Sequence, residues 1–363
     1  MTIPLNNLEN NISEHCHPSC RTCVRDCLLL QQLGINGGGL VEWKLAGGDL
    51  GISYSCTSCE LCTVICNRHL SAGDVLKTWR QSLSNDPESS IVRRSLRQTD
   101  LPENLYNFYD NNFATEENSP KPAPGRISFF PGCAMSTYTP ELAHAAYGLL
   151  CSKLPEIGWL EGCCYDPLEK LGLVSRYEIA SQRLCDDITD QGVQEIITVC
   201  PTCTYRLQAL LPDIQVISIY EWMVSEQFPT YHSDQKLAIH DACPDRFTNR
   251  IGKAVRKLLG VNNPLMKHEE RRSLCCGAGA DVPTFNPDLA QAMAERRLAE
   301  AEAGDAQVLV TYCTNCAVQL ANYSKSIPVV HALDLLLGKE DDYHLIADRV
   351  SHIREEVRQK EIG

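Results

Sequence analysis

Short apolar runs alternate with stretches of helical spacing between residues 127 and 337. The apolar runs have the length of strands, and each is followed by apolar side chains three to four positions apart. The expected strands are 127–130, 195–199, 214–219, 237–239, 307–311 and 327–330, and the expected helices are 142–150, 204–211, 254–259, 289–302 and one around Trp222. Alternating strands and helices favour parallel sheets, so we expect an α/β fold in this region.

The flanking regions have other patterns. Residues 71–96 predict a helix, whereas the glycines at 37–39 and 47–48 predict turns between short helices. Residues 98–126 are crowded with Asn, Asp and Glu and contain Pro120-Lys-Pro-Ala-Pro124, which can continue neither helix nor sheet. We expect aromatic residues of this linker to pack over a neighbouring surface. The charged end predicts a surface helix. The expected units are 1–97, a linker 98–126, 127–235, 236–337 and a C-terminal tail 338–363.

Twenty cysteines in 363 residues indicate either a disulfide framework or metal sites. A hydrophobic share of 44% is enough to form two or three cores. The N-terminus shows neither a basic region nor an apolar stretch of a secretion signal, and the cysteines cluster at two-residue spacings. Both observations favour metal-binding thiolates over disulfides.

The net charge of −13 argues against nucleic-acid binding, which requires a basic surface. No run of 18 apolar residues is present, so we expect no membrane span. We expect a cytoplasmic protein, or one held at the cytoplasmic face of the membrane by a partner.

Two cysteine runs near the N-terminus have iron–sulfur spacing. The second run is a full C-x2-C-x2-C-x3-C pattern, which is typical of ferredoxins that bind two clusters. In that pattern the fourth cysteine of each run ligates the other cluster. We therefore expect one cubane [4Fe–4S] cluster on Cys16, Cys20, Cys23 and Cys66, and a second on Cys56, Cys59, Cys62 and Cys27.

The first run departs from the usual spacing, because three residues separate Cys16 from Cys20. Its loop must bulge, and a three-iron cluster lacking Cys16 is an alternative. His15 and His17 flank this cysteine, either as iron ligands or as ordinary exposed loop residues. The proline that normally follows the fourth cysteine is also missing from both runs.

A five-cysteine pattern occurs twice, about 110 residues apart, which indicates an internal duplication. Adjacent cysteines diverge too much for one ordinary cubane, and they suit a larger framework in which thiolates bridge irons. Gly277 and Gly279 would let the backbone pass close to such a cluster, whereas the first copy has Tyr165 at the position of Gly277. The two sets are Cys133, Cys163, Cys164, Cys200 and Cys203, then Cys243, Cys275, Cys276, Cys313 and Cys316.

These repeats resemble the cysteine-rich CCG domain of the heterodisulfide reductase catalytic subunit. The whole chain resembles the fused form of that enzyme, with a ferredoxin-type module ahead of two CCG domains. The resemblance covers most of residues 15–335 and 18 of the 20 cysteines. It implies that each five-cysteine set holds one noncubane [4Fe–4S] cluster.

The residues leave alternatives open. Either CCG site could hold a structural zinc, because four thiolates suffice for a tetrahedral site. Cys151 and Cys185 match no motif and are expected to be small buried apolar residues. His240 could donate a proton near a cluster or make a structural hydrogen bond.

The resemblance implies an oxidoreductase subunit that passes electrons through two cubanes to noncubane clusters, which reduce or form a disulfide on a small thiol or a partner protein. The runner-up is a relay between quinone or cytochrome and a flavoprotein. That flavoprotein would be an FAD-linked oxidase of glycolate, lactate or glycerol 3-phosphate, or an electron-transfer flavoprotein. A zinc-bound scaffold is the third interpretation. Expected partners are a flavoprotein and a membrane cytochrome subunit.

Overall fold

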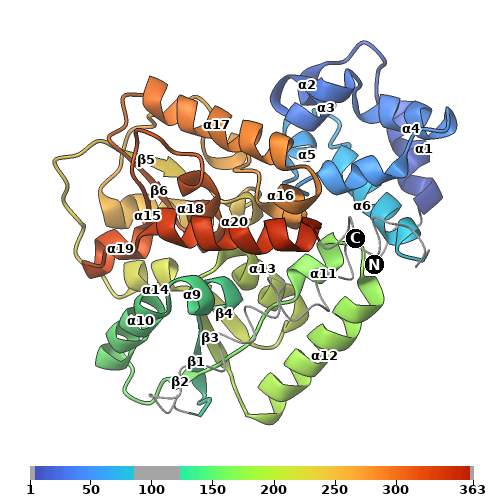
Figure 1. Ribbon diagram of the computed structural model, residues 1–363. Helices are drawn as coiled ribbons and strands as arrows, with labels where there is room; N and C mark the ends of the chain where they lie inside the picture. Colours follow the sequence, from blue (N-terminus) through green and yellow to red (C-terminus); the bar gives the residue numbers. More distant parts are fainter. Residues whose placement is uncertain (1–4, 86–122, 360–363) are drawn as a thin grey trace.

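The N-terminal unit is helical and forms one lobe of the molecule (Figure 1). The structure, a computed structural model, describes residues 5–85 and 123–359. The expected helix at 71–96 begins at Ala72 and ends earlier than predicted, at Leu83. Residues 86–96 lie outside the described residues, as does most of the linker with its aromatic residues. The helices are α1 (Leu5–His15), α2 (Thr22–Asp26), α3 (Leu28–Leu33), α4 (Gly37–Leu45), the 3-10 helix η1 (Leu50–Ser55), α5 (Leu61–Ile65) and α6 (Ala72–Leu83).

The expected turn at residues 37–39 is wrong, because these three glycines form the first turn of α4. Asn36 caps the helix by accepting a hydrogen bond from the Gly39 N–H at 2.9 Å. A Cβ at Gly37 would lie 2.7 Å from the Ile12 side chain, and one at Gly38 would lie 3.1 Å from the Cys16 Cβ. The glycines therefore let α1 pack closely against α4, and the cap offsets their low helix propensity.

The first repeat contains a four-stranded parallel sheet, as the pattern predicts. Its strand order is β2-β1-β3-β4, and the two-residue strand β2 is too short for a sequence pattern to indicate. The strands are β1 (Ile127–Phe130), β2 (Gly158–Trp159), β3 (Glu195–Thr198) and β4 (Gln215–Ser218), and the helices are α9 (Cys133–Tyr138), α10 (Pro140–Lys153), α11 (Asp166–Lys170), α12 (Val174–Asp190), α13 (Pro201–Leu210) and α14 (Ile219–Ser225).

The second repeat contains a three-stranded parallel sheet in the order β5-β6-β7. Its strands are β5 (Leu237–His240), β6 (Val308–Thr311) and β7 (Val329–His331). The helices are α15 (Arg250–Leu259), α16 (Val282–Phe285), α17 (Pro287–Ala303), α18 (Thr314–Ala321) and α19 (Ala332–Leu337), with 3-10 helices η2 (Cys243–Asp245), η3 (Glu270–Arg272) and η4 (Gly279–Asp281). The expected α/β class is thus confirmed for both repeats.

The duplication is visible in the strand register. In the first sheet Phe130, the last residue of β1, pairs with Thr198 of β3. In the second sheet His240, the last residue of β5, pairs with Thr311 of β6. Phe130 and His240 each precede the first cysteine of their repeat by three positions. The two repeats therefore place Phe130 and His240 at equivalent positions of their sheets.

One continuous apolar core joins the repeats. It contains Phe129 and Ile197 of the first sheet together with Ile239 and Val310 of the second, all fully buried. The expected C-terminal helix is α20 (Tyr343–Gln359), which crosses between the repeats in Figure 1. It is more than a surface helix, because its Tyr343, Ala347 and Val350 lie in this core.

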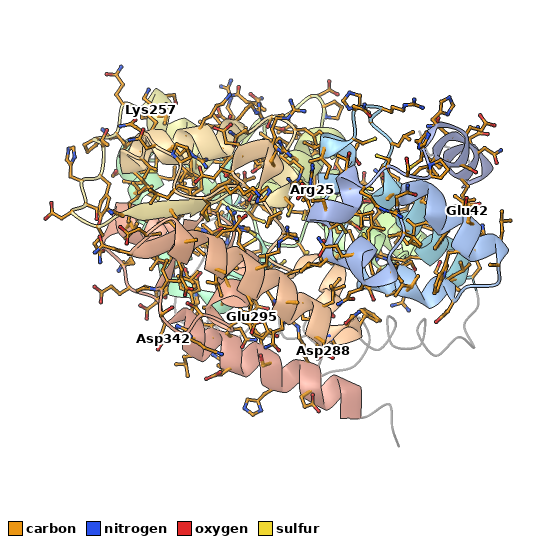
Figure 2. The ribbon with its side chains drawn as sticks, turned by 90° about the horizontal axis from the view of Figure 1, so that it is seen from above. Arg25, Glu42, Lys257, Asp288, Glu295 and Asp342 are labelled. Atoms are coloured by element: carbon orange, nitrogen blue, oxygen red, sulfur yellow. The ribbon has the colours of Figure 1, made fainter. Side chains whose placement is uncertain are left out.

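The N-terminal unit contacts both repeats. Arg80 of α6 is fully buried and donates to the Lys170 carbonyl of the first repeat at 2.6 Å. Arg296 of α17 in the second repeat donates to the Asp26 carbonyl at 3.2 Å. Seen from above, Arg25 lies at this junction, whereas Glu42 lies at the far end of the N-terminal unit (Figure 2). These hydrogen bonds hold the helical N-terminal unit against the repeats on the side of its second cysteine run.

Candidate metal centres

Strand ends place the repeat cysteines at one edge of each sheet. Cys133 follows β1 and Cys243 follows β5, each after two intervening residues. Cys200 is the N-cap of α13 and Cys313 is the N-cap of α18, at the ends of β3 and β6. The carboxyl ends of parallel strands commonly bind ligands, and helix N-termini favour negative charge. Thiolates are therefore stabilised where the fold puts them.

One central cavity of about 360 Å³ collects both cysteine sets. All ten repeat cysteines line it, together with Cys59 of the N-terminal unit. Other lining residues are the cations Lys170, Arg206 and Arg354 and the aromatic residues Tyr138, Tyr205 and Phe247. The two sheets therefore direct their cysteines into one shared space.

The sulfur atoms lie close together within this cavity. The Cys133 and Cys163 sulfurs are 3.3 Å apart in the first repeat, as are those of Cys276 and Cys316 in the second. Contact with Cys203, and with Cys313 of the other repeat, lowers the pKa of Cys200 well below its usual range. Since Cys200 and Cys313 belong to different repeats, the two sets meet.

The second cubane set surrounds a separate small cavity of about 50 Å³. Cys27, Cys56, Cys59 and Cys62 all line it. Burial raises the pKa of Cys27 to about 12 and that of Cys56 to about 11, with the nearby thiols adding to the shift. The structure thus brings together the four cysteines that the ferredoxin-type pairing predicts.

Cys59 also reaches the second repeat. Its sulfur and those of Cys243 and Cys275 lie within 4.8 Å of one another. Contacts with Cys243 and Cys275 lower the pKa of Cys59 well below its usual range. The second cubane set and the second repeat therefore share a boundary, which the sequence pattern does not reveal.

The first cubane set lies at the outer side of the N-terminal unit. Burial raises the pKa of Cys16 and Cys23, and the charges of neighbouring cysteines of the set, including Cys20 and Cys66, act in the same direction. Cys16 also lines a cavity of about 340 Å³ whose wall includes exposed His15 and His17. The predicted partners Cys16, Cys20, Cys23 and Cys66 thus lie together.

His15 and His17 make local contacts. The His15 Nδ1 lies 2.9 Å from the Asn11 carbonyl oxygen, and the His17 Nδ1 accepts from the Ser19 N–H at 3.2 Å. These contacts favour the interpretation of both as ordinary exposed residues. Cys151 and Cys185, expected to be buried, are only half-buried. Cys151 packs against the apolar core that joins the repeats, and Cys185 packs against a separate apolar cluster of the first repeat.

Arg246 is a site residue that the sequence reasoning missed. It is 2% exposed, and its Nη2 lies 3.7 Å from the Cys243 sulfur. It also donates to the carbonyls of Cys59 at 2.9 Å, Arg271 at 2.6 Å and Ser273 at 2.8 Å. This guanidinium therefore joins the N-terminal cysteine run to the second repeat. Its spacing of three residues from Cys243 was the available signal.

His240 is fully buried beside the second cysteine set. A ring nitrogen lies within 4.8 Å of the Cys276 and Cys316 sulfurs. Its Nδ1 accepts a hydrogen bond from Nε of buried Arg297 at 3.0 Å. Burial lowers the pKa of His240, and the charge of Arg297 acts in the same direction.

The substitution of tyrosine for glycine leaves the backbone frame intact. Tyr165 adopts φ +56° and Gly277 adopts φ +95°. The Tyr165 N–H donates to the Cys163 sulfur at 3.3 Å, and the Gly277 N–H donates to the Cys275 sulfur at 3.4 Å. The close approach that requires Gly279 is to the N-terminal unit, because a Cβ there would lie 2.3 Å from the Thr57 carbonyl oxygen.

The donor set suits iron–sulfur clusters or zinc. Each repeat offers five sulfurs and each N-terminal set offers four, and soft thiolates select these metals. Buried Arg246 lies beside the Cys243 thiol, and buried Arg80 donates to the Cys56 carbonyl, so both cations would offset part of the negative charge of ligand thiolates. The residues therefore fit the metal groups that their spacing predicts.

Comparison with known proteins identifies the kind of domain that each repeat forms. Residues 127–208 and 237–321 both match the cysteine-rich CCG domain. The chain thus carries two CCG cysteine-rich domains, as the resemblance implies.

The chain is also similar along most of its length to several named proteins. An iron–sulfur protein of Methanococcus maripaludis is 24% identical over 78% of this chain and 62% of its own length. One subunit of the CoM/CoB fumarate reductase of Methanothermobacter marburgensis is 23% identical over 82% and 64%, respectively. One subunit of the dihydromethanophenazine:CoB–CoM heterodisulfide reductase of Methanosarcina mazei is 22% identical over 81% and 77%. The chain thus spans less than two thirds of the first two relatives.

Across the described residues, none of the helices combines the length and apolar character needed to cross a bilayer.

Proposed function

We propose that this chain is an iron–sulfur electron-transfer subunit of the heterodisulfide-reductase type. The relatives named as subunits of a heterodisulfide reductase and a fumarate reductase support an oxidoreductase complex. The observation that carries the proposal is the shared cavity of about 360 Å³, which both five-cysteine sets line.

The order of the four cysteine sets supports a path for electrons from the N-terminal unit to the repeats. The first cubane set, including Cys16, borders the outer cavity. The second set lies inward of it, and its Cys59 meets Cys243 and Cys275 of the second repeat. Cys313 of that repeat then meets Cys200 of the first. A partner would exchange electrons at the outer set, and the substrate would bind in the central cavity.

Bound clusters would supply one-electron transfer at each of the four sites. We assign the cubane groups to Cys16, Cys20, Cys23 and Cys66, and to Cys27, Cys56, Cys59 and Cys62. We assign one noncubane group to each repeat.

Disulfide reduction needs two electrons and two protons and yields two thiols. Two cysteine sets that face one cavity could serve both sulfurs of one substrate. Lys170 and Arg206 border this cavity within a network of partly buried ion pairs around buried Asp166, in which Lys170 Nζ lies 2.7 Å from an Asp166 carboxylate oxygen. This network would hold the wall rigid while the apolar core beneath it excludes water.

The backbone frame of the first repeat supports two equivalent sites. The alternative is a relay that only connects a flavoprotein with quinone or cytochrome, and Tyr165 at the position of Gly277 weakens the preference for the disulfide role. Tyr165 makes the same N–H to sulfur contact as Gly277, which supports a site of the same kind in the first repeat.

Anaerobic purification with iron and zinc quantification and EPR tests the proposal. We expect about sixteen irons per chain, four for each of four clusters, and signals from two kinds of cluster. Addition of a small disulfide to the reduced protein should release thiols and oxidise the clusters. Zinc in place of about half the iron would reject it, as would full loading without any response to disulfides. In the latter case, reduction by a flavoprotein donor would identify the relay instead.

A further inference from the structure

His240 presents one unpaired nitrogen to the second cysteine set. It is the last residue of β5, it is fully buried, and among the described residues its Nε2 has no hydrogen-bond partner at ordinary distance. The sulfurs of Cys276 and Cys316 lie within 4.8 Å of the ring nitrogen that faces them. A buried polar atom without a partner is costly, so its position beside two metal-ligating candidates calls for a functional explanation.

Arg297 determines which nitrogen of this ring carries the proton. Its Nε donates to the His240 Nδ1 at 3.0 Å. A guanidinium has only donors and stays protonated, so Nδ1 must hold its lone pair toward Arg297. The proton of the imidazole is therefore on Nε2, the nitrogen that faces the sulfurs.

The position of Arg297 is itself set by several contacts. Its Nη1 donates to the His268 carbonyl at 2.6 Å and to the Glu300 carboxylate at 2.7 Å. Its Nη2 donates to the Ile239 carbonyl at 3.4 Å. The side chain is fully buried, and Glu300 lies one turn further along the same helix, α17. This guanidinium cannot turn away from His240 without losing several bonds.

The first repeat has no counterpart to this pair. Phe130 occupies the position of His240, three residues before the first cysteine and at the same strand register. It lies in one buried apolar cluster with Cys164 and Cys203, which correspond to Cys276 and Cys316. The phenyl ring of Phe130 offers no N–H donor, so the sulfurs on this side face a hydrocarbon edge.

We propose that Arg297 and His240 form a positioning pair that directs an N–H donor at the Cys276 thiolate and makes the metal cluster of the second repeat easier to reduce than that of the first. The inference rests on the proposed function in one respect, namely that both repeats hold iron–sulfur clusters. Reduction adds negative charge, and a hydrogen bond to a ligand sulfur stabilises the more negative state. His240 is a hydrogen-bond donor and not a metal ligand in this assignment.

An EPR-monitored redox titration of the full-length, iron-loaded protein tests it. We expect the H240F variant to lower the midpoint potential of one noncubane cluster by about 59 mV, which is a tenfold change in the reduced-to-oxidised ratio of a one-electron couple. H240Q should retain most of the wild-type potential, because its amide can accept from Arg297 and donate to sulfur. F130L is the matched control in the first repeat and should move neither potential.

Variants of Arg297 separate positioning from simple packing. R297M should lower the midpoint potential of the same cluster that H240F affects. R297K should lower this potential less than R297M does, because its ammonium can still donate to the His240 Nδ1. If H240F does not fold, the H240F/R297M double variant removes the histidine without leaving a buried unpaired guanidinium. Unchanged potentials in iron-loaded H240F or in the double variant would overturn the proposal.

Pulsed EPR on protein labelled with [15N]histidine supplies a second readout. A hydrogen-bonded imidazole should give a weak nitrogen coupling that disappears in H240Q, whereas a strong coupling typical of a nitrogen bonded to iron would overturn the proposal. These measurements distinguish failure of this inference from failure of the proposed function. A potential shift without disulfide turnover supports this inference and rejects the disulfide role, while repeats that contain no iron reject both.

Discussion

The two CCG repeats share a backbone frame but differ in the groups that face their sulfurs. In both, a cysteine follows the first strand after two residues, and another is the N-cap of the helix that follows the neighbouring strand. In both, a residue with positive φ donates its N–H to the first sulfur of the double cysteine. The duplication thus retained these features, which position the candidate ligands.

The side chains around these ligands diverged. His240 and Arg246 lie beside the second cysteine set, where the first repeat has Phe130 and Ser136 at matching positions. Four of the five cysteines are buried in the second repeat, but only Cys164 and Cys203 in the first. Burial and hydrogen bonding both tune a cluster. Two sites with the same ligands can therefore have different potentials, and the second is also the one that meets Cys59.

The largest expected effect comes from removing one member of each double cysteine. C164S and C276S should each lower the iron content by about a quarter, one cluster out of four, and each should spare the other repeat. Iron quantification with EPR checks this. If C164S leaves the iron content unchanged while C276S lowers it, only the second repeat holds an iron cluster and the sites are not equivalent in kind.

Arg246 should matter far more than its counterpart in the first repeat. R246M leaves three carbonyls and the Cys243 sulfur without their donor, so we expect a loss of about 3 kcal/mol in unfolding free energy. It should also loosen the contact between Cys59 and the second repeat.

Denaturant titration of the loaded protein measures this loss, with S136A as the matched control. Because Ser136 Oγ has no hydrogen-bond partner among the described residues, S136A should change stability by less than about 0.5 kcal/mol. Equal effects of the two variants would contradict the asymmetry.

A third comparison concerns the residue after each double cysteine. G277A should destabilise by about 2 kcal/mol, because Gly277 has φ +95° and a Cβ there would lie 2.6 Å from the Ala290 carbonyl oxygen of α17. Y165G keeps the positive φ that glycine adopts readily, and it should retain its cluster. Thermal unfolding and iron content check both, and a fully stable G277A would show that α17 can move away.

The smallest effect is a pH dependence at the helix that follows the last strand of each repeat. In the second repeat Asp334 caps α19 by accepting from the His331 N–H at 3.0 Å, and burial, together with the charge of Asp341, raises its pKa to about 8. Because the pKa of Asp334 is raised in the folded protein, its protonated carboxyl contributes its full stability below pH 4, and this contribution is lost as the pH rises toward 8. We expect on the order of 2 kcal/mol less stability at pH 8 than at pH 5 from this group.

D334N should remove that part of the pH dependence, as measured by thermal unfolding between pH 5 and pH 8. The equivalent cap in the first repeat is Glu221, which is partly exposed and lies 3.6 Å from Arg250. E221Q therefore serves as the matched control that removes the charge of the cap carboxyl in the first repeat. A wild-type profile in D334N would assign the dependence to other groups.

Local pattern was sufficient for much of the fold. The prediction is close for the strands at 127–130 and 195–199, which correspond to β1 and β3, because burial on both faces of a parallel sheet makes their apolar runs continuous. It is also close for the helix at 289–302, which corresponds to α17. The glycines at 37–39 indicate a turn but form a helix, because their close packing against Ile12 and Cys16 is a tertiary contact. Strand β2 was missed because two residues carry no periodicity.

The sequence by itself determined which residues are candidate ligands, since cysteine spacing is local and a duplicated pattern of five thiols predicts two related sites. It also determined that the sites follow strand ends, because the apolar runs stop at the cysteines. Only the tertiary structure decided that both sets face one cavity, that Cys59 reaches Cys243 and Cys275, and that Arg246 and Arg297 are buried beside them. Such contacts join residues up to about two hundred positions apart, and they depend on how whole layers pack. No local periodicity records that packing.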